Sequence, residues 1–552
     1  MTAGGWLEIG LFLAILTALT PVVGGYLARV FGGEVAFLGF AERPLYRLMG
    51  VDPEHGQDWR GYARSVLIFS AGSFLLLYAI LRTQGLQPGG PGAPPPNLSF
   101  NTTVSFVTNT NWQYYAGETT MTALTQMAGL AVQNFASAAV GIAVVIAVIR
   151  GLVARSGREL GVFFVDAARA ILYVLLPLSL LLAAFFVTQG VAQSAHLPVA
   201  SQEAIKLLGT NGGGFFNVNS AFPFENPTWL SNFVQMLAIL AIPAGLTATY
   251  GRMAGNRRQG WAVFAAMLSL FVVAVAALYA AESATTPAMH AAGVVGPNME
   301  GKEQRFGIAS SALYAAVTTA ASCGAVNAAM ESLSGLGGAV PMAQMMTGEV
   351  IFGGVGSGLY GMLLFVLLAV FVAGLMVGRT PELLGKKIEA REIKLTVLAT
   401  IAVPLVVLFA GAVAIATKHG RASISASGPQ GFSETLYAYV SQGNNNGSAF
   451  AGYTGSLQPH GTNRGAVGLD LANYLGGAAM LAGRFLPIVL VLAIAGALAG
   501  KRVSPAGPGT LRTDTPTFVV MLVAVVLIVA LLTFVPALLL GPVVQGLSGR
   551  LF

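Results

Sequence analysis

The chain contains ten apolar stretches that are each long enough to cross a lipid bilayer as one helix, and this feature leaves few folds open. A helix needs about 20 apolar residues to cross a hydrocarbon core about 30 Å thick. The chain is 55% hydrophobic and only 9% charged, whereas about a quarter of the residues of a soluble protein are charged. The alternating apolar strands typical of a membrane barrel are absent from the sequence. We therefore predict an all-α polytopic membrane protein with ten transmembrane helices. The predicted spans are approximately 6–30, 64–82, 125–149, 171–189, 230–250, 261–281, 349–377, 395–416, 471–500 and 517–541.

Four short polar segments lie in gaps between these spans and recur at intervals of roughly 100 to 120 residues, which indicates a repeated unit. The segments are 109–113, 210–214, 322–325 and 444–447. Non-helical backbone is tolerated at membrane depth only where protein buries it or water reaches it. We therefore expect four membrane-pore-membrane repeats around a pseudo-fourfold axis, with one extra helix at each end. The predicted repeats are 64–149, 171–250, 261–377 and 395–500, and the extra helices are 1–30 and 517–541.

A stretch that could form a short re-entrant helix precedes each polar segment. These stretches are 101–108, 201–209, 308–321 and 432–443. We expect Ser201 and Ser433 to begin the second and fourth of them, because serine side chains cap free helix amides. The carboxyl end of a helix carries partial negative charge, so four such ends at one axis favour a desolvated cation.

Glycines in the polar segments are suited to a filter lined by backbone carbonyls. Gly212, Gly213, Gly324 and Gly447 have no Cβ and can adopt positive φ, which turns carbonyls toward one centre. One isolated glycine-rich loop is most simply a turn, but four in register between spans favour an ion filter. The segments contain no ring of carboxylates, which argues against a divalent-cation filter.

Four glutamates flank the polar segments: Glu118, Glu203, Glu331 and Glu349. They either concentrate cations at the mouth of the filter or are solvated residues near an outer surface. The sequence leaves both interpretations open.

Two features beneath the third and fourth segments have functional and structural interpretations. The glycine-rich run 353–361 weakens a rigid helix. A break there serves either as a gate or lateral exit for the ion, or as close packing of small residues against a neighbouring helix. The glycines are Gly353, Gly354, Gly356 and Gly358. Arg484 lies within a span, where a charge is costly and by default belongs to a polar cavity. It either blocks passage under the filter or forms a salt bridge or snorkels near the helix end.

Charge predicts the orientation of the chain. Most of the 29 Lys and Arg residues fall in or beside five loops, at 29–64, 150–169, 252–258, 379–394 and 501–512. By the positive-inside rule these loops are cytoplasmic, so both termini and all four polar segments face outward. The net charge of +7 follows from this topology and gives no reason to invoke nucleic acid. The single Cys323 permits no internal disulfide.

Several motifs together resemble those of the KdpA family, the potassium-binding subunits of the bacterial Kdp P-type ATPase. They are FVTNTNWQ at 106–113, GTNGGGFF at 209–216, FENP at 224–227, TTAASCGAV at 318–326, GGVGSGLYG at 353–361, GRTPE at 378–382 and NNNGSAF at 444–450. The likeness extends essentially end to end. Asn327 departs from the expected pattern, since we expected an apolar residue behind the third segment.

The resemblance implies a high-affinity, ATP-driven potassium uptake complex in the bacterial cytoplasmic membrane. This chain would bind K⁺ from outside and deliver it laterally toward the ATPase subunit KdpB, with KdpC and KdpF as accessory subunits. The filter residues that it implies are Asn109, Thr110, Asn111, Thr210, Asn211, Gly212, Ser322, Cys323, Gly324, Asn445, Asn446 and Gly447. Gln113 and Gly213 would support the filter from beside it.

The sequence contains no phosphorylation motif and no phosphate-binding loop. We therefore expect a transport subunit that binds no nucleotide and is not catalytic by itself. From the residues alone, a stand-alone potassium channel or a Trk-like potassium transporter remains the alternative, and a scaffold within a membrane complex is a third possibility.

Overall fold

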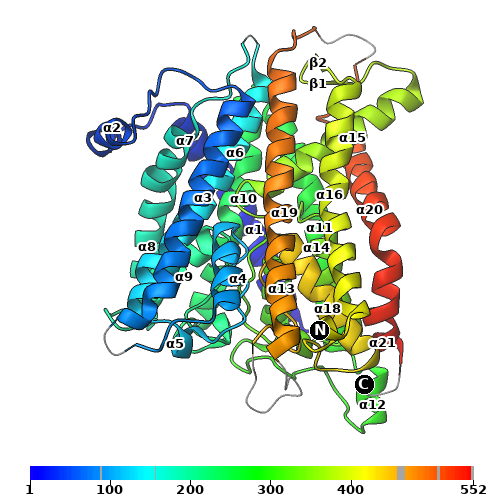
Figure 1. Ribbon diagram of the computed structural model, residues 1–552. Helices are drawn as coiled ribbons and strands as arrows, with labels where there is room; N and C mark the ends of the chain where they lie inside the picture. Colours follow the sequence, from blue (N-terminus) through cyan, green and yellow to red (C-terminus); the bar gives the residue numbers. More distant parts are fainter. Residues whose placement is uncertain (88–89, 156, 457–465, 506–509, 549–552) are drawn as a thin grey trace.

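The computed structural model describes residues 1–87, 90–155, 157–456, 466–505 and 510–548. Within these residues, ten helical segments are long and apolar enough to cross a membrane. They run roughly parallel in Figure 1, and the predicted all-α fold with ten spans is confirmed. The segments are Ala3–Phe31, Trp59–Leu86, Thr125–Val153, Phe163–Thr188, Trp229–Met253, Arg257–Ala291, Ser357–Val377, Ala390–Ala416, Asp470–Ala499 and Pro516–Leu547.

The spans divide into central and peripheral helices. In the span Thr125–Val153, which ends in α6 (Val132–Val153), 89% of the apolar window is buried inside the protein. Only 22% is buried in the spans that contain α3 (Trp59–Thr83) and α20 (Pro516–Leu538). An apolar helix that protein does not cover is suited to contact with lipid. α6 therefore belongs to the core, and α3 and α20 are expected to face the bilayer.

The remaining long helices complete the bundle. They are α1 (Ala3–Phe31), α7 (Phe163–Arg169) and α8 (Leu176–Thr188), α10 (Trp229–Met253), α11 (Arg257–Ser283), α15 (Ser357–Val377), α16 (Ala390–Ala416) and α19 (Ala466–Ala499). Short helices cap the lower end of the bundle in Figure 1: α5 (Gly117–Thr120), α12 (Pro287–Ala291) and α21 (Val544–Leu547). Another short helix, α17 (Lys418–Arg421), follows α16 in the chain.

A short helix precedes each of the four polar segments, as the sequence predicts. These pore helices are α4 (Pro96–Val107), α9 (Val199–Leu208), α13 (Gly307–Ala320) and α18 (Gly428–Gly443). The predicted starts of α9 and α18 are wrong. Ser201 and Ser433 lie inside these helices, and their hydroxyls donate to the carbonyl oxygens of Pro198 and Pro429. α9 begins two residues before Ser201 and α18 five residues before Ser433, each next to a proline whose fixed φ suits a first helical turn.

The predicted span 349–377 is wrong at its start. A separate helix, α14 (Gly335–Met346), is followed by a non-helical stretch, and α15 begins only at Ser357. Five residues of this break have positive φ, which an α-helix does not accept: Gly348, Glu349, Phe352, Gly353 and Gly356. The amide of Gly353 donates to the carbonyl of Ala320 at the end of α13, at 2.7 Å. The break is therefore fixed to the third pore helix.

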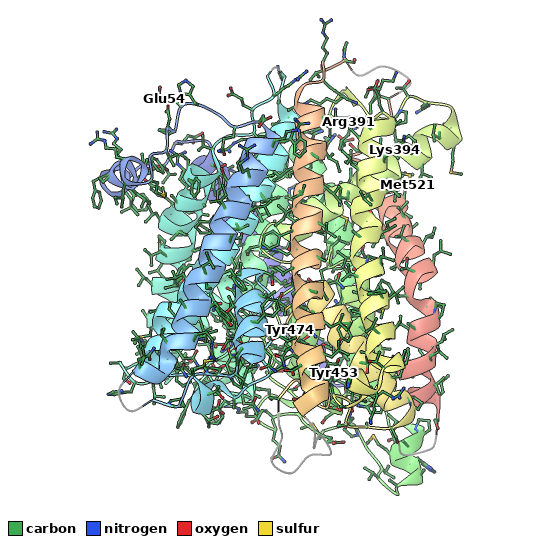
Figure 2. All side chains as sticks on the ribbon, in the orientation of Figure 1. Glu54, Arg391, Lys394, Tyr453, Tyr474 and Met521 are labelled. Carbon is green, nitrogen blue, oxygen red and sulfur yellow. The ribbon has the colours of Figure 1, made fainter. Side chains whose placement is uncertain are left out.

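The two ends of the bundle differ in composition. The upper end in Figure 1 contains α2 (Gly39–Leu48) and a hairpin of β1 (Glu382–Leu383) and β2 (Lys386–Lys387). Figure 2 shows Arg391 and Lys394 at this end, and Tyr453 and Tyr474 near the opposite end. The start of α1 and the helix α21 lie toward the opposite end (Figure 1).

Candidate ion filter

The four polar segments share one unusual backbone pattern. In each segment, counting the fourth from Asn445, the first and third residues have positive φ, between 47° and 101°, while the residue between them does not. This alternation turns consecutive carbonyls toward the same side. The pairs are Asn109 and Asn111, Thr210 and Gly212, Ser322 and Gly324, and Asn445 and Gly447. These are the positions that the resemblance implies for the filter, and the residues between them are Thr110, Asn211, Cys323 and Asn446.

Each pore helix holds its polar segment in the same way. The residue four positions before the first left-handed residue offers its backbone carbonyl to the amide of the middle residue. The bonds are Thr110 N to Ser105 O at 2.8 Å, Asn211 N to Lys206 O at 2.8 Å, Cys323 N to Thr318 O at 3.2 Å and Asn446 N to Ser441 O at 2.8 Å. A repeated bond of this kind gives the four segments one common geometry.

Glycines bring neighbouring segments into direct backbone contact. A Cβ on Gly212 would overlap the carbonyl of Cys323, and one on Gly447 would overlap that of Thr110. A Cβ on Gly324 would lie 2.5 Å from the carbonyl oxygen of Asn446. At three of the four junctions between neighbouring segments, a glycine therefore allows the two backbones to touch. The fourth has Asn111, whose Cβ packs against Gly213.

Side-chain amides and hydroxyls tie the segments together. Asn109 Nδ2 donates to the carbonyls of Gly209 and Thr210, at 3.1 and 3.2 Å. Ser322 Oγ donates to Asn444 O at 3.2 Å, and Asn445 Nδ2 donates to Thr110 Oγ1 at 2.9 Å. The structure thus places the twelve predicted filter residues in one ring.

Gln113 lies beside the filter and links the first and second segments. Its Oε1 accepts from Gly214 N at 3.1 Å, and its Nε2 donates to Gly214 O at 3.3 Å and to the Tyr115 hydroxyl at 3.0 Å. This reciprocal pair fixes the exit of the second segment against the first.

Sequence reasoning missed Asn219. This buried residue has a left-handed backbone, with φ 55°, and its Nδ2 donates to Gly212 O at 2.6 Å. Its sequence distance from the segment hid it, although an asparagine in a glycine-, asparagine- and serine-rich loop was an available signal.

A large cavity of about 1350 Å³ opens on the side of the ring that faces α12 and α21. The third residue of every segment lines it: Asn111, Gly212, Gly324 and Gly447. This common lining places the four segments around one entrance. Glu331 also lines the cavity, whereas Glu203 and Glu349 are 1% and 3% exposed and do not line it. Neither of these two is a solvated residue of the mouth. Glu118 does not line the cavity either, but its Oε2 accepts from the amide of Asn217, which does.

A smaller cavity of about 90 Å³ lies on the other side of the ring. Ser322, Asn445, Glu349 and Arg484 line it, together with residues of α15, α16 and α20. The cavity is displaced toward the third and fourth repeats, because Asn109 and Thr210 do not line it. Arg484 is 4% exposed and its Nη2 donates to Ser137 O at 3.4 Å.

The glycine-rich run lies directly beneath the filter and is also tightly packed. The amide of Val355 donates to Thr210 Oγ1 at 3.0 Å. A Cβ on Gly354 would lie 3.1 Å from that of Ser322. One on Gly356 would overlap the carbonyl of Gly141, and ones on Gly353 and Gly358 would overlap the break itself. The position of the run is therefore compatible both with a gate or lateral exit for the ion and with close packing of small residues.

Asn327, the departure from the family pattern, is buried behind the third segment. Its Nδ2 donates to Asn232 Oδ1 at 2.9 Å, and Asn226 Nδ2 donates to the same oxygen at 2.9 Å. A polar partner on α10 thus compensates for the burial of its amide.

The chemistry of the ring favours a monovalent cation. It offers neutral carbonyl, amide and hydroxyl oxygens, with the carboxyl ends of four pore helices behind them. No group of three or more His, Cys, Asp or Glu residues that could hold a metal ion occurs in the described part of the chain.

Fold and site together define a polytopic helical membrane protein in which four polar loops of common geometry surround one entrance. The solved potassium transporter TrkH from Vibrio parahaemolyticus has the same fold, with a TM-score of 0.53 and 16% identity over 86% of this chain and 97% of that one.

The chain belongs to the KdpA family. The family profile described as potassium-transporting ATPase A subunit matches residues 10–547, so the resemblance noted in the sequence is confirmed. Three relatives are each named potassium-transporting ATPase potassium-binding subunit. The protein of Granulibacter bethesdensis is 55% identical over 99% of both chains. That of Sorangium cellulosum is 54% identical over 99% of this chain and 100% of the relative. That of Mesorhizobium japonicum is 52% identical over 99% of both.

Proposed function

We propose that this chain selects K⁺ at the ring of four segments and passes it to the ATPase subunit of a potassium uptake complex. The observation that carries the proposal is the fourfold repetition of left-handed first and third residues, all third residues lining one entrance. Stacked carbonyl rings replace the hydration shell of a potassium ion. The filter residues are the twelve residues of the ring, and Gln113 and Gly213 support it.

The proposed ion route turns sideways beneath the filter. Arg484 lies in the small inner cavity and opposes a straight path for a cation by charge repulsion. The same cavity extends between α15, α16 and α20, and two of these helices adjoin the break. The break containing Gly353, Gly354 and Gly356 then serves as the gate, with Gly358 in the first turn of α15.

The proposed partners follow from the family. The chain supplies ion selection as a subunit that is not itself catalytic, and KdpB hydrolyses ATP, with KdpC and KdpF as accessory subunits. No nucleotide binds to this chain. The proposed location is the bacterial cytoplasmic membrane, with both termini and the filter entrance on the extracytoplasmic side and the basic loops in the cytoplasm. The proposed repeats are 64–149, 171–250, 261–377 and 395–500.

The test is the ATPase activity of the complex purified with this chain, titrated with K⁺ and then Na⁺. The proposal expects stimulation by K⁺ and none by Na⁺ at the same concentration. Gly324→Ala forces a Cβ toward the carbonyl of Asn446 and should raise the apparent KM for K⁺ at least tenfold. Gly411→Ala is the matched control, since nothing lies within 4 Å of a Cβ there.

Absence of a co-purifying ATPase would contradict the proposal and favour a stand-alone channel or Trk-like transporter. An ATPase activity that does not depend on K⁺, or a wild-type KM in Gly324→Ala, would show that the ring does not select the ion.

A further inference from the structure

The last turns of the four pore helices contain one equivalent position, and the second repeat differs from the others there. Ser105, Lys206, Thr318 and Ser441 each lie four residues before the first left-handed residue of their segment, and each gives its carbonyl to the middle residue. Three of the four have a small hydroxyl side chain. The second repeat has a lysine.

In two repeats this side chain braces the outgoing part of its own segment. Ser105 Oγ donates to Trp112 O at 3.0 Å, and Ser441 Oγ accepts from Gly447 N at 3.0 Å. The position is therefore suited to fixing the backbone just beyond the middle residue. Lys206 contacts the corresponding part of the second repeat indirectly, through the side chains that its ammonium group binds.

Lys206 is fully buried and its ammonium group has four oxygen partners. Its Nζ lies 2.6 Å from Glu203 Oε2 and 2.9 Å from Glu225 Oε2. It also donates to Asn219 Oδ1 at 2.7 Å and to Ser220 Oγ at 3.0 Å. A buried ion group of this kind is retained only when its geometry satisfies every charge, and by itself it is weak evidence for stability.

The partners of Lys206 hold the outgoing part of the second segment. Asn219 Nδ2 donates to Gly212 O at 2.6 Å, so the lysine fixes the asparagine that holds a filter carbonyl. Glu225 Oε1 accepts from Phe216 N at 2.9 Å. Both Glu225 oxygens lie 3.0 Å from where a Cβ of Gly214 would stand.

Among the described residues, the corresponding carbonyls of Asn111, Gly324 and Gly447 accept no side-chain hydrogen bond. The outermost layer of the filter thus has one carbonyl fixed from outside the ring. The number, direction and strength of the carbonyls around an ion determine which alkali ion they favour.

We propose that Lys206 is a positioning residue that determines ion specificity: through Asn219 it fixes the direction of the Gly212 carbonyl in the outer filter layer. The inference rests on the proposed function, because it assumes that the ring selects the ion. Glu203 and Glu225 balance the lysine charge so that it does not repel the incoming cation.

The experiment measures the apparent KM and kcat of the purified complex for K⁺, Rb⁺ and NH₄⁺. The test variant is Lys206→Met combined with Glu203→Gln, which removes one charge of each sign. Its matched control is Lys302→Met combined with Glu282→Gln. That ion pair is equally buried, with Nζ and Oε2 2.6 Å apart, but Glu282 binds Asn298 and Ser334 rather than filter residues.

We expect the Lys206 double variant to raise the KM for K⁺ at least tenfold and to change the K⁺ to Rb⁺ preference, with kcat within about twofold of wild type. The Lys302 double variant should keep the wild-type KM and preference, although it also loses a buried pair. Equal effects of the two double variants on KM, or an unchanged preference in the Lys206 variant, would overturn the proposal.

If the Lys206 variant does not assemble, Asn219→Gly tests the connection from Lys206 to the Gly212 carbonyl. Glycine keeps the left-handed backbone and removes only the side-chain amide. It should reproduce the change in KM and preference. A wild-type preference in Asn219→Gly overturns the inference alone. A wild-type complex whose ATPase ignores K⁺ would instead refute the proposed function.

Discussion

Five residues of the ring combine a side chain with a left-handed backbone: Asn109, Asn111, Thr210, Ser322 and Asn445. Such conformations cost of order 1–3 kcal/mol each and persist only where the surroundings hold them. Thr210 is the least suited to it because it is β-branched. Its hydroxyl accepts from Val355 N, so the break beneath the filter helps to hold the strained residue in place. The filter and the proposed gate are thus physically connected.

Asn109→Gly separates the backbone role of this residue from its side-chain role. Glycine accepts φ 65° but loses every hydrogen bond of the side-chain amide: from Nδ2 to Gly209 O and Thr210 O, and to Oδ1 from Asn211 Nδ2 and Ser137 Oγ. Because each lost bond contributes about 1 kcal/mol and about 1.4 kcal/mol corresponds to a factor of ten, we expect the KM for K⁺ to rise at least tenfold, measured by K⁺-stimulated ATPase activity of the complex. Leu384→Gly is the control, since Leu384 has φ 52° outside the filter. A similar KM change in the control would contradict the assignment.

The buried carboxyl of Glu434 predicts a pH dependence of stability. Burial and the neighbouring carboxyl of Glu331 raise the pKa of Glu434 to about 7. The folded state then binds a proton that the unfolded state releases near pH 4.5, so stability falls as the pH rises from about 4.5 to 7 and is constant above. We expect the melting temperature of the purified complex to fall by a few degrees from pH 5 to 7, and to fall less in Glu434→Gln. Parallel pH profiles of the two proteins would refute this.

At the residue scale, the sequence was sufficient to predict the residues of the ring but not the buried residues that hold the ring in place. Asn109, Gly212, Gly324 and Gly447 lie in short motifs whose residue types already suggest left-handed backbone. In the sequence, Lys206 looks like an ordinary charged residue outside the five basic loops. Its partner Glu225 is distant in sequence, and only the folded return of the chain brings the two together.

The helices that support the filter were harder to place at their ends than in their middles. Hydropathy finds a span because each residue contributes independently, whereas a helix end depends on local hydrogen bonds. Ser201 and Ser433 were plausible caps, but α9 begins just after Pro198 and α18 begins just before Pro429. The break before α15 was foreseen from glycines 353–358, yet Glu349 and Phe352 also take part, and neither residue type signals positive φ.

The hairpin of β1 and β2 joins the ends of α6 and α19 at the basic end of the bundle through Lys386, and we call this connection the latch. Lys386 is 1% exposed, and its Nζ donates to Gly151 O and Leu498 O, both at 2.9 Å. These carbonyls belong to the last turns of α6 and α19, where a cation is favourable. Burial nevertheless lowers the pKa of Lys386 to about 8, so its contribution to stability improves as the pH rises from about 8 to 10.

Lys386→Met should lower the unfolding free energy by about 2–4 kcal/mol, since two charge-assisted hydrogen bonds are lost and two carbonyls are left without their donor. Thermal unfolding of the purified complex measures the change. Lys387→Met removes the same charge from an exposed neighbour and should have little effect. Equal melting temperatures for the two variants would show that the latch contributes nothing.

The molecule as a whole has a functional asymmetry that no single segment reveals. All four repeats contribute to the outer entrance, but the inner cavity is lined by the third and fourth segments and by α15, α16 and α20. Repeat spacing predicts the fourfold ring, because each motif is local. The sideways displacement depends on the packing of Arg484 and the break, so spacing alone could not locate the cavity.

Orientation in the membrane gives the prediction at the scale of the whole chain. The single cysteine, Cys323, is fully buried, so an introduced cysteine can be labelled against little background. Val295 is 85% exposed and follows Val294, which lines the entrance cavity, and Arg391 lies at the basic end (Figure 2). In right-side-out spheroplasts, a membrane-impermeant maleimide should label Val295→Cys and not Arg391→Cys. Permeabilisation should make both reactive, and the wild-type chain should stay unlabelled throughout. The reverse pattern would place the filter entrance in the cytoplasm, so the basic loops would not determine the topology and the ring could not collect potassium from outside the cell.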